Sequence, residues 1–131
     1  MYDALNIDFK SEYRLAICRP QGILDARFAA QLLRFLQTQE EPPSEVFDRV
    51  LDLTHVTEVQ LSSKEIWGYA SSRRDATAHL PPVRTAIITS GTAETVALVY
   101  ASLMKDSRIE VRIFDNADSA ADWLSVPRGM W

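Results

Sequence analysis

Cysteine and histidine are scarce in this sequence, which has one Cys, Cys18, and two His, His55 and His79, in 131 residues. A lone cysteine cannot form an internal disulfide, and these three side chains lack the spacing of metal ligands. Cys18 also falls in an alternating, strand-like pattern, which predicts a small buried side chain rather than a reactive thiol. We therefore expect no disulfide, no metal and no cofactor.

Long hydrophobic runs are also lacking. The most apolar stretch, residues 95–103, is far shorter than the roughly 20 residues that a membrane-spanning helix needs. Residues 1–6 have neither the basic start nor the apolar core of a signal peptide. We expect a cytoplasmic protein that does not insert into a membrane.

Positive charge is not in excess, because 14 Lys and Arg face 18 Asp and Glu, for a formal net charge of −4. Proteins that bind nucleic acid draw most of their non-specific affinity from Lys and Arg contacts to phosphates. Nucleic acid is therefore not an expected partner. The basic pair Arg73 and Arg74 and the region 105–112 are interrupted by acids, which predicts solvated helix faces and loop ends.

The motifs of common catalytic and nucleotide-binding sites are missing. Neither a phosphate-binding loop nor the dinucleotide glycine fingerprint occurs, and the one glycine turn between an expected strand and an expected helix contains Gly91 and Thr92. These two are candidates for binding an anion or small ligand, with capping of the next helix by Thr92 as the alternative. An enzyme would have to rely on His55 with Ser62 or Ser63, so we expect no enzymatic activity.

Hydrophobic residues make up 47% of the chain and charged residues 24%, the balance of one ordinary globular domain. The periodicity predicts an α/β fold: a single mixed sheet of about five strands, formed by an N-terminal antiparallel hairpin and then parallel βα units, with about four helices. We expect the domain to span residues 1–125 and a C-terminal tail to span residues 126–131. The expected strands are 5–9, 13–19, 46–53, 84–88 and 109–114; the expected helices start at Asp25, Ser62, Gly91 and Ala117.

One run of residues resembles a known family. The sequence RVLDLTHVTEVQLSS at 49–63 resembles the strand and loop of the STAS domain, the anti-sigma-factor antagonist family, in which Leu-Asp-Leu-Ser leads to Asp-Ser-Ser-Gly. The runs GILD at 22–25 and EVRIF at 110–114 look more like the SpoIIAA-like branch of small bacterial proteins. The resemblance covers the order of elements throughout and implies that fold.

The resemblance also implies a switch. In the antagonist family the second serine of the loop is phosphorylated by a partner kinase, and Ser62 matches it, with Ser63 as the neighbouring candidate. The sequence departs from the motif, because Gln60 stands at the Asp position, Leu61 at the first serine and Ser63 at the glycine. Ser62 and Glu65 also fit a capping box, in which each side chain binds the other's backbone amide. Both roles remain open for Ser62.

Two functions follow as expectations. The first is a regulatory protein-interaction module, whose partner is a kinase-like or sigma-regulatory protein or a second copy of the chain as a homodimer. Its candidate contacts are Thr54, His55, Gln60, Trp67 and Tyr69, since Trp and Tyr often anchor interfaces; Tyr69 fits a core position equally well. The alternative is a small protein that binds a lipid or hydrophobic metabolite beneath the helix at 95–103, whose apolar residues also suit simple burial.

Overall fold

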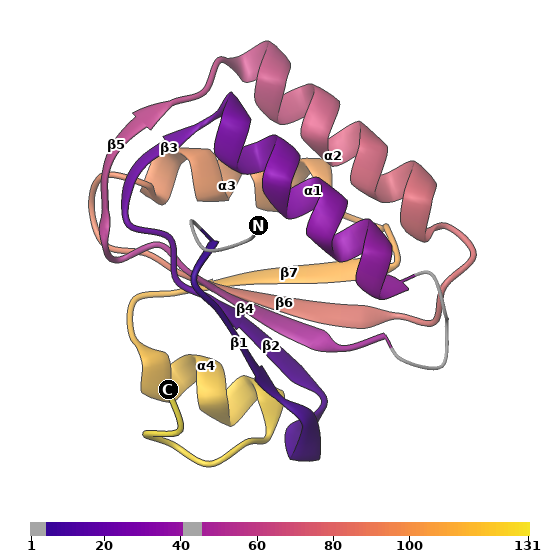
Figure 1. Cartoon of the computed structure of the whole chain (residues 1–131), viewed down its shortest axis with the longest axis vertical. Coiled ribbons are helices and arrows are strands. Elements are labelled where there is room, and N and C mark those ends of the chain that lie inside the picture. Colours follow the sequence, from indigo (N-terminus) through magenta and orange to yellow (C-terminus); the bar gives the residue numbers. More distant parts are fainter. Residues whose placement is uncertain (1–4, 41–45) are drawn as a thin grey trace.

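A mixed five-stranded sheet forms the centre of the molecule, with helices on both faces (Figure 1). The computed structural model describes residues 5–40 and 46–131. Within them the strands are β1 Ile7–Lys10, β2 Leu15–Cys18, β3 Gly22–Asp25, β4 Asp48–Asp52, β5 Val56–Gln60, β6 Val83–Ile88 and β7 Ile109–Phe114. The helices are α1 Ala26–Glu40, α2 Ser63–Thr77, α3 Glu94–Leu103 and α4 Ala117–Leu124, with a 3-10 turn at Ser11–Tyr13.

The sheet has the strand order β1-β2-β4-β6-β7. β1 and β2 form the predicted antiparallel hairpin, and β2, β4, β6 and β7 then run parallel to their neighbours. Helical crossovers between parallel strands place α1, α2 and α3 on one face and α4 on the other (Figure 1). The α/β class and the mixed sheet predicted from the sequence are confirmed.

A second, two-stranded sheet was not predicted. β3 pairs in parallel with β5 beyond the ends of the main strands (Figure 1). The sequence had indicated only that the first hairpin ends at Gly22, ahead of the helix cap at Asp25, and that a loop follows Leu53. Both strands are short, and Gly22 lies at φ 86°, a conformation that glycine adopts without strain. Because β3 and β5 are distant in the chain, the local sequence of neither strand indicates that the two pair.

Three of the helices begin at side-chain caps. Asp25 Oδ1 accepts a hydrogen bond from the Phe28 amide at 3.0 Å, as the sequence predicted, and Asn116 accepts one from Ser119 at α4. Ser62 is the N-cap of α2 within a complete capping box. For α3 the N-cap is Ala93 without a side-chain hydrogen bond, so the predicted capping role of Thr92 is wrong.

Hydrophobic side chains fill both faces of the sheet. One cluster lies under α1, α2 and α3 and includes Phe28, Leu32 and Ile87. A second lies under α4 and includes Ile17 and Val50. The residues of the C-terminal segment Val126, Met130 and Trp131 pack against this second cluster. No helix among the described residues has the length and hydropathy needed to cross a membrane.

Candidate functional site

An apolar cavity lies between the sheet and the three helices α1, α2 and α3. Its volume is about 100 Å³, and it is partly open to the surface. Most of its wall belongs to the hydrophobic cluster of this face, with Phe28 and Leu32 from α1, Tyr69 from α2 and Val96 from α3. Among the lining residues, Glu65 is exposed, which places an opening near the start of α2.

Strand register determines which side chains form the floor of the cavity. Arg49 of β4 is paired with Ala16 of β2 and with Thr85 of β6. Leu51, two residues further along β4, is paired with Cys18 and Ile87, and all six side chains line the cavity. Because side chains alternate between the faces of a strand, Val50 lies in the cluster beneath α4 instead. The floor of the cavity therefore consists of two rows of side chains. One row contains the polar residues Arg49 and Thr85, and the row of Leu51 contains neither a charged group nor a hydroxyl.

A buried ion cluster lies at the polar end, formed by Glu40, Arg49 and Arg73. Arg73 Nη1 donates to Glu40 Oε1 at 2.9 Å, and its Nη2 donates to Oε2. Arg49 Nη2 lies 2.8 Å from Glu40 Oε2. The exposed fractions are 5% for Glu40, 8% for Arg49 and 0% for Arg73. The prediction of a solvated Arg73 is therefore wrong, because this side chain pairs with the end of α1 inside the protein.

The three charges of the ion cluster influence one another strongly. Burial raises the pKa of Glu40, but hydrogen bonds and charge from Arg73 and Arg49 outweigh burial and hold this pKa below its ordinary value. Burial lowers the pKa of Arg49, and Glu40 offsets only part of the effect. For Arg73, burial lowers the pKa, but the hydrogen bond to Glu40 and the electrostatic effects of Glu40, Tyr69 and Tyr100 together raise it above its ordinary value. All three groups are charged at neutral pH.

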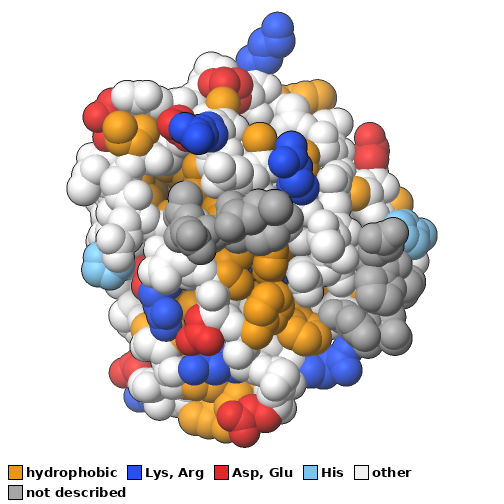
Figure 2. Space-filling model, in the orientation of Figure 1, with side chains coloured by type: hydrophobic (Ala, Val, Ile, Leu, Met, Phe, Trp, Pro, Cys, Tyr) orange, Lys and Arg blue, Asp and Glu red, His pale blue; other side chains and the backbone are white. Residues whose placement is uncertain are grey.

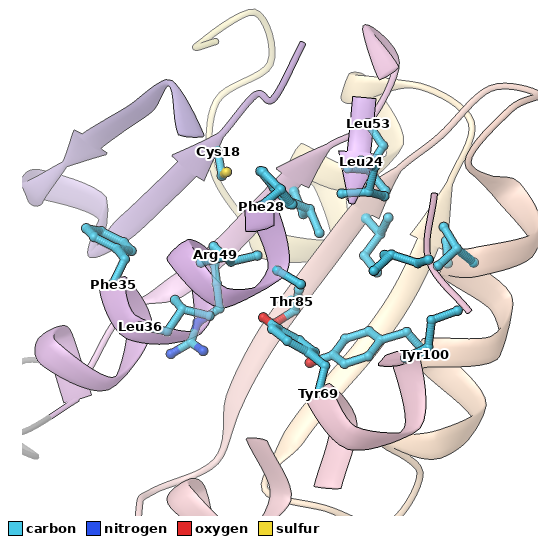
Figure 3. Close-up of a pocket in the computed structure, with 18 of the residues that line it drawn as sticks. Cys18, Leu24, Phe28, Phe35, Leu36, Arg49, Leu53, Tyr69, Thr85 and Tyr100 are labelled. Carbon is cyan, nitrogen blue, oxygen red and sulfur yellow. The ribbon is translucent and has the colours of Figure 1, made fainter. Parts of the chain in front are cut away.

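Two tyrosines and a threonine add neutral polar groups to the same half of the cavity. The rings of Tyr69 and Tyr100 lie 5.5 Å apart between centroids, at 58°. Burial raises the pKa of both phenols, so both remain protonated. Figure 3 shows Thr85 and the two tyrosines close together, whereas the guanidinium of Arg49 points away from the two rings. The surface that these residues expose to the cavity is nevertheless almost entirely apolar.

The apolar half lies toward the small sheet and the starts of α2 and α3. Leu24, Phe28 and Leu53 meet there (Figure 3), joined by Leu61 and Val96. Cys18 lines the same cavity, where its thiol contacts the Leu5 carbonyl at 3.1 Å. Burial raises the pKa of Cys18 to about 12. The predicted burial of this cysteine is confirmed.

The candidate phosphoacceptors lie on the surface beside the opening of the cavity. Ser62 and Ser63 are both exposed. Ser62 Oγ accepts from the Glu65 amide at 3.1 Å, and Glu65 Oε1 accepts from the Ser62 amide at 2.9 Å. The capping role of Ser62 is thus present in the structure, while its phosphorylation stays a prediction.

The five candidate partner contacts divide into two groups. Thr54, His55 and Gln60 are exposed, and Trp67 is 63% exposed on α2. Tyr69 instead points into the cavity. Trp67 and Tyr69 therefore face different surroundings, the one at the surface and the other in the cavity.

The face of the molecule drawn in Figure 2 carries both charge signs. Figure 2 shows Lys and Arg side chains interspersed with Asp and Glu, and a group of hydrophobic side chains between them on the viewed face. The ligand candidates Gly91 and Thr92 are exposed, Gly91 at φ 72°, and neither lines the cavity. Within residues 5–40 and 46–131, no three His, Cys, Asp or Glu side chains gather as a metal site would require.

The ion cluster was missed by the sequence reasoning, although two of its members carried a signal. Arg49 stands inside the β-rich run RVLDL, and Arg73 stands on the apolar stripe of α2 together with Ile66 and Ala70. A charged residue at an otherwise buried position needs a buried partner of opposite sign. Which acid supplies the partner is not visible in the sequence, because Glu40 is 33 residues from Arg73.

Comparison with known proteins identifies the fold. No protein-family model and no curated protein matches the sequence significantly. The structure is similar to that of an uncharacterised protein of the DUF3478 family with a SpoIIAA-like fold from Shewanella loihica PV-4. The TM-score is 0.60, with 18% identity over 90% of this chain and 90% of that chain. The chain therefore has a SpoIIAA-like α/β fold, as the sequence resemblance implied.

Proposed function

We propose that the protein binds a small hydrophobic ligand in the cavity between the sheet and α1, α2 and α3. The observation that carries this proposal is an apolar cavity of about 100 Å³, which is lined by residues of a hydrophobic cluster and has an opening to the surface. Apolar cavities of this kind stay dry and take up apolar guests; one of about 150 Å³ accommodates benzene. The helix at 95–103, under which a ligand site was expected, supplies Val96, Ala97 and Tyr100 to the wall.

The size of the cavity sets the size of the ligand. By comparison with the benzene cavity, about four carbon atoms fit inside the cavity of about 100 Å³. Each methylene group transferred from water into such a site contributes about 0.8 kcal/mol, which is about fourfold in affinity. A longer chain gains nothing further once it passes the opening near Glu65.

A series of straight-chain 1-alcohols tests the proposal by isothermal titration calorimetry. Affinity for the protein should rise about fourfold per carbon up to about four carbons and then level off. Ala29→Leu, which places three more carbons into the wall of the cavity, should weaken binding of 1-hexanol. Ala30→Leu is the matched control, because Ala30 is the exposed neighbour on the same helix.

Two results would count against the cavity as the binding site. One is the absence of heat of binding for every alcohol in the series. The other is equal weakening by Ala29→Leu and Ala30→Leu, which would indicate binding on the outer surface of α1.

A protein-interaction role is the second candidate, and the exposure of Trp67 favours it. Large aromatic side chains contribute much of the energy of protein interfaces, and this one lies on α2 one turn from Ser62 and Ser63. Phosphate on Ser62 would find free amides at the helix start, but it would repel the Glu65 carboxylate that now binds the Ser62 amide. Phosphorylation would thereby alter the same surface that carries Trp67.

Mass spectrometry of the protein isolated from its native cells tests this second role. A phosphate on Ser62 or Ser63, together with a copurifying protein that Trp67→Ala loses, would support it. Unmodified serines and the same copurifying proteins with wild type and Trp67→Ala would refute it. Arg27→Ala is a suitable control, since Arg27 is exposed on α1.

A further inference from the structure

The strand β7 forms one edge of the main sheet and pairs, among the described residues, with β6 alone (Figure 1). The Thr89 amide donates to the Phe114 carbonyl at 3.0 Å, so the even-numbered residues of β7 direct their backbone groups at β6. Because these groups alternate along a strand, Ile109, Val111 and Ile113 direct theirs away from the sheet. An edge of this kind is a template for pairing with another chain.

Only one of these three outward positions is protected. Ser107 Oγ accepts from the Ile109 amide and donates to the Ile109 carbonyl, each at 3.1 Å. For Val111 and Ile113, no described residue takes the outward amide or carbonyl. β7 also has no proline and no bulge, the features that often keep an edge strand from pairing. The edge is therefore open over the second half of the strand.

The side chains of β7 divide by charge between the two faces of the sheet. Glu110 and Arg112 are exposed on the face of α4, where the Arg112 guanidinium lies 5.3 Å from the centre of the Trp123 ring. Neither forms an ion pair with a described residue. The odd-numbered side chains are apolar and pack on the other face, under α3. One acid and one base two residues apart thus stand beside the open edge.

This pattern is complementary to itself. When a second β7 runs antiparallel to the first with Val111 opposite its own copy, each Glu110 lies opposite an Arg112. The two residues then form a non-hydrogen-bonded pair, the kind in which facing side chains are closer. Opposite charges in facing positions stabilise a pair of strands, and like charges destabilise it. A shift by two residues in either direction would place Arg112 opposite Arg112, or Glu110 opposite Glu110.

The neighbouring helix α3 adds an exposed apolar side chain on the same side. Leu98 is 54% exposed. Tyr100 faces α2, because its ring lies against that of Tyr69, and two residues of a helix are about 200° apart around the axis. Leu98 therefore lies on the side of α3 away from α2. Since α3 packs on β7, that side adjoins the open edge.

We propose that the chain forms a symmetric dimer in which β7 pairs antiparallel with β7 of a second copy, with Val111 on the two-fold axis. The two five-stranded sheets would then form one continuous sheet. This inference goes beyond the proposed ligand binding and is independent of it, because no residue of β7 lines the cavity. It also uses a different surface from the exposed Trp67 on α2.

Sedimentation equilibrium of the wild-type protein and of charge variants tests the dimer and its register. The mass of the wild type should rise with concentration from that of one chain to that of two. Glu110→Arg and Arg112→Glu each place like charges opposite one another twice, so each should raise the dissociation constant of the dimer at least about tenfold. The double variant Glu110→Arg/Arg112→Glu restores both pairs with the signs exchanged and should dimerise like wild type.

A mixture of the two single variants gives the sharpest result. A Glu110→Arg chain carries two bases at these positions and an Arg112→Glu chain carries two acids, so all facing charges are opposite only in the mixed dimer. Native mass spectrometry, which distinguishes the two chains by mass, should show the mixed dimer in excess over both symmetric ones. High salt should reduce this preference, because exposed charges are screened.

Two further variants serve as controls. Glu12→Arg makes the same change of charge at an exposed position between β1 and β2, at the other edge of the sheet, and should leave the dissociation constant unchanged. Ser107→Ala frees the backbone groups of Ile109 and should tighten the dimer. Arg112→Glu also loses the contact with Trp123; if that variant fails to fold, Glu110→Arg and Ser107→Ala still decide the question.

Three results would overturn the inference. One is a wild-type protein that stays monomeric up to about 1 mM, a concentration at which even a millimolar dissociation constant gives a measurable dimer. Another is a dimer that Glu110→Arg and Glu12→Arg weaken equally, which would reflect the general charge of the protein. The third is a dimer that Glu110→Arg does not weaken, which would place the contact on another surface, such as that of Trp67.

Discussion

The two faces of the sheet are built on different principles. Beneath α4, the side chains of Leu15, Ile17 and Val50 are at most 1% exposed and form an apolar cluster that α4 and the C-terminal residues cover. Beneath α1, α2 and α3, the cluster contains an open cavity and three buried charges. Close packing stabilises a protein, while a cavity reduces its stability and buried charges are costly to desolvate. The first face therefore supports the fold, and the second has the features of a binding site.

The difference between the faces arises within single strands. In β4, Arg49 faces the cavity and the adjacent Val50 faces α4. In β6, Thr85 and Ala86 divide in the same way. Because successive side chains of a strand point to opposite faces, each central strand contributes polar groups to one side without disturbing the other.

Among the variants that test this difference between the two faces, Glu40→Gln should lower the unfolding free energy most. It leaves Arg49 and Arg73 buried without a counter-charge, and loss of one partner from a buried ion pair typically costs about 3–5 kcal/mol of unfolding free energy. Urea denaturation measures the change. Asp122→Asn is the control, because Asp122 forms an exposed pair with Arg128, and loss of an exposed pair should leave the unfolding free energy nearly unchanged. A loss below about 1 kcal/mol for Glu40→Gln would mean that the cluster is accessible to water.

Truncation of one leucine on each face should give unequal losses. Leu124, the last residue of α4, is 3% exposed in the packed cluster, and Leu32 of α1 lines the cavity. Buried Leu→Ala substitutions cost about 2.7–5.0 kcal/mol, with larger values where a larger void is left. Leu32 already lacks neighbours on its cavity side and has fewer contacts to lose. We expect Leu124→Ala to cost about 1 kcal/mol more than Leu32→Ala in urea denaturation; equal costs would show that the faces are packed alike.

The ion cluster should also make stability depend on pH in the acid range. The pKa of Glu40 is lowered in the folded state, so the folded protein binds fewer protons than the unfolded chain in that range. The contribution of Glu40 is complete above the unfolded pKa of about 4.3 and is lost as the pH falls through the lower folded value. The difference in unfolding free energy between wild type and Glu40→Gln should therefore shrink below pH 4. A difference that stays constant from pH 7 to pH 3 would contradict a charged Glu40.

Local patterns explain why much of the fold was predictable. The alternation in β1 and β2 and the apolar stripes of α1 and α2 depend on neighbours a few residues apart, which the sequence displays directly. The same holds for the caps at Asp25 and Ser62. The pairing of β3 with β5 depends on contacts across more than thirty residues, and short strands carry little signal of their own.

The candidate site was less accessible to sequence reasoning for a related reason. An apolar residue such as Leu24 has the same appearance whether it contacts another side chain or an empty volume. The burial of Arg73 depends on the point at which α1 ends, because only there does Glu40 meet α2. The ligand beneath the helix at 95–103 stays a prediction. A cavity does lie there, yet the apolar residues Leu98 and Val99 of that helix are exposed, and the buried ion cluster was not foreseen.

The smallest effects should come from the helix caps, one on each side of the sheet. Ser62 caps α2 beside the opening of the cavity, and Asn116 caps α4 with a hydrogen bond of 2.8 Å to the Ser119 amide. Replacement of a cap by alanine costs about 1 kcal/mol, so Ser62→Ala and Asn116→Ala should lose similar amounts in urea denaturation. Ser62→Asp, which retains a cap, should lose little.

The caps should differ in their effect on ligand binding. Glu65 both closes the capping box and lines the cavity, so Ser62→Ala frees a side chain at the opening, whereas Asn116→Ala acts on the opposite face. We expect Ser62→Ala to change the rate of 1-hexanol exchange, measured by NMR line shape, and Asn116→Ala to leave it unchanged. Identical exchange rates in the two variants would show that the start of α2 does not control the entry of ligand into the cavity. Any regulation through Ser62 would then have to act on the surface around Trp67 rather than on the cavity, because the cap would have no means of influencing the ligand.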